Sequence, residues 1–140
     1  MIVTFDFDGT LWRWGFDPKE GIFSRSCGPD PIAMGTLKHW KSKGASIHIV
    51  TSRVSSTRSE VDDFTDSYGD LIDGVHYTEG CWKSQTLATL GSDLHFDDDS
   101  EELAQLEPRM RGILWTSGYL DENDQVCDPE DERFHFSNWE

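Results

Sequence analysis

The sequence predicts an α/β fold built on a doubly wound, mostly parallel sheet of five strands. Two observations lead to that prediction. Short apolar runs alternate with segments of helical periodicity along most of the chain, an order that is typical of parallel sheets with helices on both faces. The chain is also 140 residues long with no internal repeat or linker, so we expect one domain over residues 1–140.

Five apolar runs are the predicted strands. They cover residues 2–5, 47–50, 71–77, 93–96 and 112–115. Each is short enough to be a strand rather than a helix.

Four helices are predicted between or after these strands, at residues 32–43, 57–69, 82–90 and 100–106. Gly44 and Gly91 are placed to end the first and third of them. Thr57 and Glu60 match a capping box at the start of the second helix. Asp99 is the expected cap of the fourth.

The charge of the chain limits its partners. The formal net charge is −15, and residues 121–140 hold eight Asp or Glu against one Arg. An acidic surface repels nucleic-acid backbones and anionic membranes, so long nucleic acid is an unfavourable partner, whereas a small anion in a locally positive pocket is not.

The three cysteines are widely spaced and are interpreted as free thiols. With no leader pattern and no long apolar run, we expect a cytoplasmic protein without a membrane anchor.

Polar side chains follow three of the predicted strands at the point where each strand ends. In an open parallel sheet, ligands bind beyond these carboxyl ends. The residues placed there are Asp6 and Asp8, then Thr51, Ser52 and Arg53, then Asp97, Asp98 and Asp99. The sequence therefore predicts a binding site at this edge.

Two of these acids pose an electrostatic problem. Asp6 and Asp8 are two residues apart, so on a strand both side chains point to the same face. Two such carboxylates repel each other unless a cation lies between them or one takes up a proton. Oxygen ligands without neighbouring His or Cys favour Mg²⁺. Taken singly, each group also has a plain structural interpretation, as a strand end, a helix cap or, for Lys83, a surface charge; together they favour a site.

Four motifs in order resemble those of the haloacid dehalogenase (HAD) superfamily of phosphohydrolases. DFDGT at residues 6–10 is similar to the first motif and IVTSR at residues 49–53 to the second. Lys83 in GCWKSQ stands where the third-motif lysine lies, and HFDDDSEE at residues 95–102 is similar to the acidic fourth motif. The resemblance covers residues 2 to about 106 and implies a HAD-like core.

The resemblance also implies catalytic roles for four residues. Asp6 attacks phosphorus and forms an aspartyl-phosphate, while Asp8 is the general acid and then the general base. Thr51 and Lys83 hold the phosphoryl oxygens. Further phosphate or substrate contacts are expected from Gly9, Thr10, Ser52, Arg53 and Trp12.

The cofactor implied is Mg²⁺. Its expected ligands are Asp6, the backbone carbonyl of Asp8 and one acid of the fourth motif. Because Phe96 ends the apolar run, Asp98 is the first choice for that acid and Asp97 the second.

The implied activity is that of a magnesium-dependent phosphomonoesterase. Only a small flap, residues 12–31, is available to cover the site, which is then either open or closed by a second copy of the chain. Aromatic residues in the flap either stack a nucleobase or pack the flap onto the body. The preferred substrate is a small phosphomonoester such as a 5′-(deoxy)nucleotide. The alternatives are a polynucleotide-end or phosphoprotein phosphatase, and a non-catalytic protein that binds a phosphorylated ligand.

The acidic extension, residues 116–140, lies beyond the four motifs. Its charge is typical of a solvated segment, whereas Phe134, Phe136 and Trp139 favour docking on the body or on a partner. The sequence leaves both interpretations open.

Overall fold

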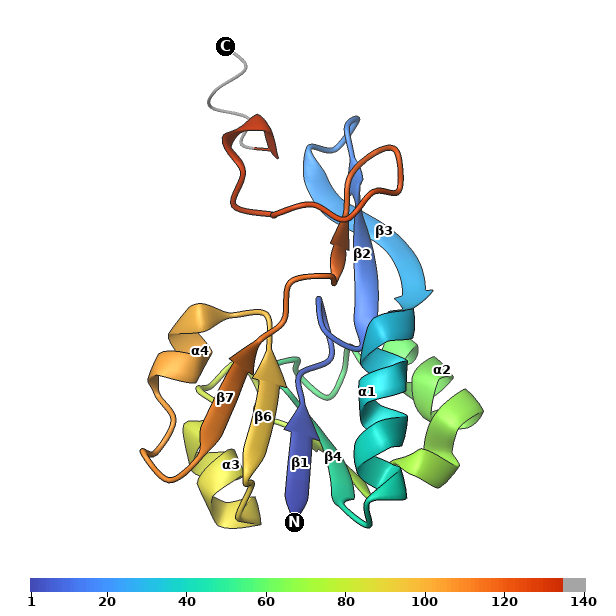
Figure 1. Ribbon diagram of the computed structural model, residues 1–140. Coiled ribbons are helices and arrows are strands. Elements are labelled where there is room, and N and C mark those ends of the chain that lie inside the picture. The colour runs from blue at the N-terminus through green and yellow to red at the C-terminus, as the bar shows by residue number, and fades with distance from the viewer. Residues whose placement is uncertain (135–140) are drawn as a thin grey trace.

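The computed structural model describes residues 1–134 and confirms the α/β fold class. Its main sheet has the strand order β5-β4-β1-β6-β7, and every neighbouring pair is parallel (Figure 1). The strands are β1 (Ile2–Phe5), β4 (Ser46–Thr51), β5 (Gly74–Tyr77), β6 (Leu94–Asp97) and β7 (Arg111–Leu114). All five predicted strands are present. The third is shorter than predicted because Gly69–Leu71 forms the 3₁₀ turn η1.

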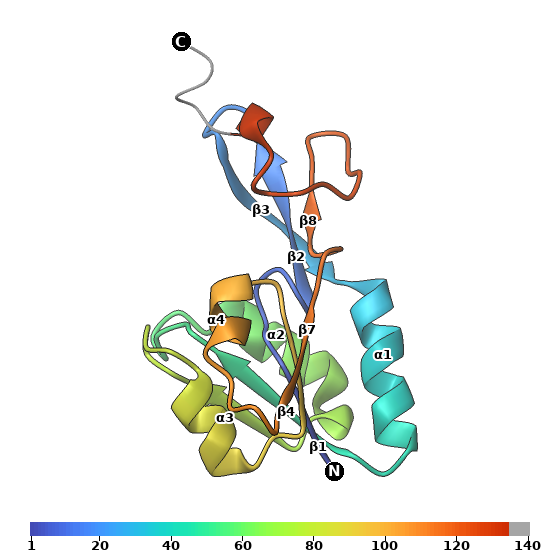
Figure 2. The ribbon, with the colours of Figure 1, turned by 60° about the vertical axis from the view of Figure 1, so that its left-hand side comes forward.

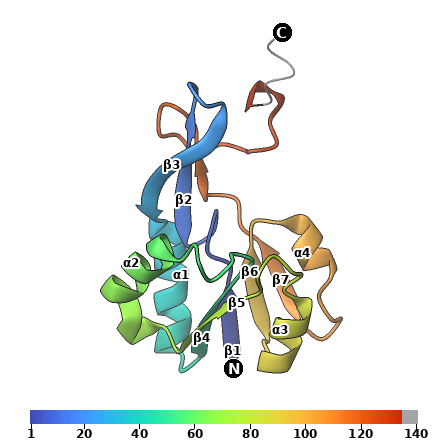
Figure 3. The ribbon, with the colours of Figure 1, turned by 180° about the vertical axis from the view of Figure 1, so that it is seen from behind.

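Helices cover both faces of this sheet, which makes it doubly wound. They are α1 (Pro31–Ser42), α2 (Ser59–Tyr68), α3 (Ser84–Leu90) and α4 (Ser100–Ala104). The first two lie on one face and the last two on the other (Figure 3). The main core includes Val3, Phe5, Phe7, Leu37, Ile47, Ile49 and Phe64. A smaller cluster contains Val50, Met110 and Leu87 of α3. The central strands β1, β4 and β6 are largely buried and mostly apolar, as expected for strands covered on both faces, whereas β7 at the edge of the sheet is exposed.

The helix ends agree with the sequence at three points and differ at one. Gly44, with a φ of 86°, follows Lys43, the C-cap residue of α1. Asp99 caps α4 by accepting from the Glu101 amide, and Gly91 ends α3 with a positive φ of 74°. The predicted capping box at Thr57 and Glu60 is wrong: the residue before α2 is Arg58, and no side chain caps this helix.

The second half of the predicted capping box is used elsewhere. Glu60 accepts hydrogen bonds from the guanidinium of Arg53 at 3.4 and 3.5 Å, and the Thr57 hydroxyl donates to the Val54 carbonyl. The Ser59 hydroxyl also donates to Glu60 Oε2 at 2.6 Å, so the Glu60 carboxylate has partners other than the backbone amide that a capping box would supply.

The predicted flap forms the hairpin of a second, smaller sheet. Strands β2 (Trp12–Asp17) and β3 (Ile22–Pro29) are antiparallel, and β8 (Tyr119–Leu120) pairs with β2 in parallel. This sheet stands above the carboxyl ends of the main strands (Figures 1 and 2). Here Trp12 is buried and stacks on Phe7 with ring centroids 5.5 Å apart, so at this position the aromatic ring packs the flap onto the body.

The extension docks on the flap as far as the structure describes it. The 3₁₀ turn η2 (Glu132–Phe134) brings Phe134 into a cluster with Phe16 and Cys127. Of the residues that favoured docking, Phe136 and Trp139 lie outside the described part of the chain.

The three cysteines are free thiols, as predicted. Within residues 1–134, no helix has both the length and the hydropathy needed to cross a bilayer.

Candidate active site

The central strand of the main sheet positions the first acidic residue. Asp6 directly follows β1, and its amide donates to the Phe96 carbonyl of β6 at 2.8 Å. This bond keeps the chain extended one residue past the strand. Because β4 and β6 flank β1 on opposite sides, the chain reverses its winding here, and such a switch point is where open α/β sheets bind ligands. Asp97 is the last residue of β6 and reaches the same edge.

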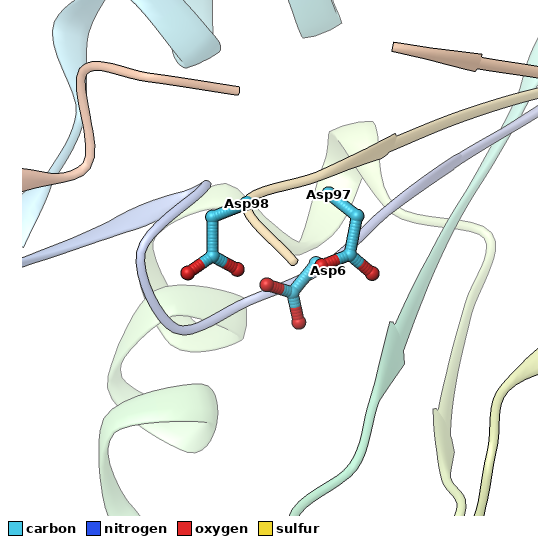
Figure 4. A group of neighbouring side chains, drawn as sticks. All are labelled: Asp6, Asp97 and Asp98. Atoms are coloured by element: carbon cyan, nitrogen blue, oxygen red, sulfur yellow. The ribbon is translucent and has the colours of Figure 1, made fainter. Parts of the chain in front are cut away.

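Three carboxylates converge at this edge. Oxygen atoms of Asp6, Asp97 and Asp98 all lie within 4.8 Å of one another, and Figure 4 shows the three carboxylates gathered side by side. The predicted convergence of residues far apart in the sequence is therefore present in the structure. Asp8 is not part of this group, because its carboxylate is turned to Arg53.

Lys83 joins two of these acids. Its Nζ atom donates to Asp6 Oδ1 at 2.8 Å and to Asp97 Oδ2 at 2.7 Å, and its side chain is only 3% exposed. Burial lowers the pKa of Lys83, but the charges of Asp6 and Asp97 outweigh it and the net pKa is raised. The backbone is held as well, since the Lys83 amide donates to the buried carboxylate of Glu102 at 3.0 Å. The lysine is therefore a fixed cation beside the acids.

The hydrogen bonds of Asp97 already occupy both of its oxygens. Oδ2 accepts from Lys83 and contacts His95 Nε2 at 2.8 Å, and Oδ1 accepts from the Asp99 amide at 3.0 Å. Burial alone would raise the pKa of Asp97, but the His95 hydrogen bond and the Lys83 charge lower it to about 2. Thr4 Oγ1 lies 2.8 Å from the other imidazole nitrogen, so the ring is held at both ends.

Asp98 has a different environment. Its Oδ2 accepts a hydrogen bond from the Tyr119 hydroxyl at 2.8 Å. Burial and the nearby charge of Asp6 raise the pKa of Asp98 to about 10, and burial likewise raises the pKa of Asp6. A buried and a half-buried carboxylate whose charged forms are disfavoured are the electrostatic signature of a site that a cation would stabilise.

The donor set fits Mg²⁺. All three groups are hard oxygen donors, and the cluster contains no His or Cys ligand. Because Asp97 is committed to Lys83, His95 and the Asp99 amide, Asp6 and Asp98 are the better candidates for direct ligation. This agrees with the sequence-based order of preference for the fourth-motif acid.

The stability of the metal-free protein is predicted to depend on Asp98. A folded pKa above the unfolded value means that the folded state keeps a proton that the unfolded state releases. In EDTA, stability is therefore greatest below the unfolded pKa and is lost as pH rises toward the folded pKa, between about pH 5 and pH 9. Asp98→Asn should flatten this dependence. Urea unfolding as a function of pH measures it.

Asp99→Asn is the matched control, because the substitution removes a neighbouring charge and asparagine still caps a helix. The control should keep the wild-type slope. A slope that survives in Asp98→Asn and disappears in Asp99→Asn would contradict the assignment.

The general-acid candidate lies beside the cluster rather than in it. Arg53 donates from Nε to Asp8 Oδ2 and from Nη2 to Asp8 Oδ1, both at 2.8 Å. Trp14 Nε1 donates to Asp8 Oδ1 at 2.9 Å. The Asp8 hydrogen bonds raise the pKa of Arg53 further. Arg53 is thus held by a two-pronged ion pair with Asp8, and its contact with substrate stays a prediction.

Of the other predicted site residues, two are buried at the edge of the sheet and the rest lie elsewhere. Thr51 and Thr10 are buried at the edge: the Thr10 hydroxyl donates to Asp6 Oδ2 at 3.2 Å, and Thr51 Oγ1 accepts from the Arg53 amide. Ser52 is exposed. Trp12 does not reach the site, because it packs in the core and its Nε1 atom donates to Ser26 Oγ.

Gly9 is required for steric reasons. Its φ is +77°, and a Cβ there would lie 2.5 Å from the Tyr119 ring and 2.6 Å from Asp98 Oδ2. The predicted turn after the strand is therefore also a point of close packing.

Four residues of the site were not predicted from the sequence. They are Trp14, His95, Glu102 and Tyr119, which contact Asp8, Asp97, the Lys83 amide and Asp98 respectively. His95 carried a signal, because a polar residue inside a buried strand needs a partner. Tyr119 carried none, since it lies beyond the motifs.

A cleft of about 1160 Å³ opens beside Asp98 and Tyr119, between α4 and the extension. Its lining is acidic and aromatic, and within the described residues it includes no Lys, Arg or His. The main lining groups are Asp98, Asp99, Glu101, Asp128 and Glu130, with Phe23, Leu114, Trp115, Tyr119 and Val126.

Comparison with known proteins supports the fold. No protein-family model matches the chain, and no curated protein matches it in sequence. Among solved structures it is similar to a chain of the Pnkp1/Rnl/Hen1 RNA repair complex, with a TM-score of 0.62 and 17% identity. The match covers 81% of this chain and 41% of the other, so this chain spans less than half of its neighbour's length.

Proposed function

We propose that this protein is a magnesium-dependent phosphomonoesterase that works through an aspartyl-phosphate on Asp6. The observation that carries the proposal is the convergence of Asp6, Asp97 and Asp98 within 4.8 Å, with Lys83 bridging two of them. The four motifs that resemble the HAD superfamily lie at this same edge. Mg²⁺, when bound by Asp6 and Asp98, would neutralise charge on the phosphoryl oxygens.

The proposed chemistry proceeds in two steps. A carboxylate oxygen of Asp6 attacks phosphorus in line, and the bond from phosphorus to the leaving oxygen breaks with its electron pair on that oxygen. Asp8 gives the leaving oxygen a proton. A water molecule then attacks phosphorus, its proton goes to Asp8, and Asp6 is released with inorganic phosphate. Lys83 and the Thr51 hydroxyl hold phosphoryl oxygens.

Arg53 sets a condition on this cycle. The Arg53 guanidinium donates a hydrogen bond to each carboxylate oxygen of Asp8. Oδ2 accepts only the bond from Arg53 Nε and keeps a lone pair that can carry the transferred proton, and a protonated Asp8 would be held less strongly by the guanidinium. An arriving phosphoryl group, as an anion, is a competing partner for Arg53.

The cleft favours a leaving group that is neutral or positively charged. Five carboxylates line it, and an anionic leaving group would be repelled there. The aromatic side chains provide stacking surfaces for a ring or a cation. A polynucleotide end is the second candidate, because the structural neighbour comes from an RNA repair complex, but the acidic lining disfavours it.

Phosphate release from a panel of substrates tests the proposal. We expect Mg²⁺-dependent, EDTA-sensitive release from p-nitrophenyl phosphate, an amino-alcohol phosphate and a nucleoside 5′-monophosphate. For an oligonucleotide with a terminal phosphate, kcat/KM should be lower by about tenfold or more, because its backbone charges face the acidic cleft.

The panel separates the candidate functions. A preference for the oligonucleotide would favour the polynucleotide-end phosphatase. No release from any substrate, by protein that binds Mg²⁺ and phosphate, would favour a non-catalytic binding protein.

A further inference from the structure

Tyr119 links the extension to the acidic cluster. It belongs to β8, which follows the main sheet in the sequence and lies outside the four motifs. Its hydroxyl donates to Asp98 Oδ2 at 2.8 Å. Because a tyrosine hydroxyl is protonated at neutral pH, the bond has a fixed direction and favours the carboxylate form of Asp98.

The position of Tyr119 is set by its neighbours on both sides. Strand β8 pairs with β2 in register Trp14–Tyr119, and the Trp14 amide donates to the Gly118 carbonyl at 3.1 Å. A Cβ at Gly118 would lie 1.7 Å from the Gly9 carbonyl oxygen. The backbone at Gly118, immediately before β8, is therefore in direct contact with the loop that follows Asp6 and Asp8.

A second set of bonds anchors the segment before β8. Arg13 Nε donates to the Ser117 carbonyl at 3.0 Å, and the side chains of Trp115 and Ser117 donate to Asp30 Oδ2 at 2.9 and 2.6 Å. Asp30 is fully buried and caps α1. These contacts hold the start of the extension against both the flap and the body, so Tyr119 is presented from a rigid element.

The hydrogen bond determines how Asp98 can bind a cation. With Oδ2 held by Tyr119, the carboxylate cannot rotate freely, and its other oxygen would be the one to ligate a metal ion between Asp98 and Asp6. Single-oxygen ligation of this kind suits Mg²⁺, which binds few carboxylates in a strict geometry. Outer groups that orient a ligand in this way change metal affinity although they do not touch the ion.

We propose that Tyr119 is a positioning residue of the metal centre, so that the extension completes the site rather than merely following it. The inference rests on the metal site of the proposed function, but not on the identity of the substrate. It assigns the extension a role that the four motifs do not include.

Tyr119→Phe tests the inference, with Tyr77→Phe as the matched control. The Tyr77 hydroxyl is also buried, yet within residues 1–134 it has no hydrogen-bond partner, so its loss breaks no such bond. Titration calorimetry of the full chain with Mg²⁺ is expected to show affinity weakened by about 10–100-fold in Tyr119→Phe and unchanged in Tyr77→Phe. Activity of Tyr119→Phe on p-nitrophenyl phosphate should recover at saturating Mg²⁺.

A second variant disturbs the contact between Tyr119 and Asp98 through the backbone. Gly118→Ala keeps the hydroxyl but forces β8 away from Gly9, so it should also weaken Mg²⁺ binding. Melting in EDTA establishes that each variant is folded.

The outcomes separate this inference from the proposed function. Unchanged Mg²⁺ affinity in both Tyr119→Phe and Gly118→Ala, or no Mg²⁺ binding by the wild-type protein, would overturn the positioning role. Mg²⁺ binding that weakens as expected, in a protein that hydrolyses none of the substrates, would support the positioning role and reject only the phosphatase.

Discussion

Replacing Asp6 with asparagine is expected to abolish turnover while leaving the protein folded. The amide has nearly the same shape, so the bond from Lys83 to position 6 can be kept, but it cannot act as the nucleophile. We expect kcat on p-nitrophenyl phosphate to fall by about 10⁴-fold or more, as happens when a nucleophile is removed from a catalytic unit. Steady-state phosphate release measures this loss.

Asp63→Asn is the control, since it removes an exposed carboxylate of α2 and should leave kcat unchanged. Asp8→Asn distinguishes the roles of the two motif acids. Loss of a general acid costs about 10²–10⁴-fold, and it should cost less for p-nitrophenyl phosphate, whose leaving group needs little protonation. Wild-type turnover in Asp6→Asn would reject the nucleophile assignment.

Replacing Lys83 with methionine is expected to produce the largest loss of stability. The side chain is 3% exposed and neutralises Asp6 and Asp97, which are 6% and 0% exposed. Removing one member of a buried ionic cluster leaves unpaired charge in the interior, and typically costs about 3–5 kcal/mol. Urea unfolding in EDTA measures this. Activity should be lost as well, because the phosphoryl oxygens lose a fixed cation.

Lys41→Met provides a matched comparison. Lys41 pairs with Asp73 at 2.9 Å, a distance close to those of Lys83, but both partners are partly exposed. Its replacement should cost less than about 1 kcal/mol. Adding Asp97→Asn to Lys83→Met should restore part of the lost stability, because it removes one of the orphaned charges. Equal effects of Lys41→Met and Lys83→Met would contradict the buried-cluster account.

The main sheet and the acids at its edge were predictable because both depend on local patterns. Strand β1 was predicted at its observed bounds, and Asp6, Asp97 and Asp98 meet because parallel strands end at a common edge. The same rule placed Thr51 and Arg53 near the site. These inferences need only strand direction and the position of each strand end.

The parts that were not predictable depend on contacts between segments far apart in the sequence. The ion pair of Arg53 with Asp8, 45 residues away, was not predicted. Glu60 fitted a local capping box and instead joins that ion pair. Trp12 looked like a substrate contact, yet it is core. A single sequence gives no register between the flap and the extension, so the contact of Tyr119 with Asp98 had no signal.

The most direct test of the account asks which atom receives the phosphoryl group. The wild-type protein is mixed with radiolabelled phosphomonoester and Mg²⁺, quenched in acid during turnover, and digested for peptide mapping. The account predicts an acid-stable, base-labile label on Asp6, lost in Asp6→Asn and absent when EDTA is added. Turnover in the wild type with the label on another residue would contradict it.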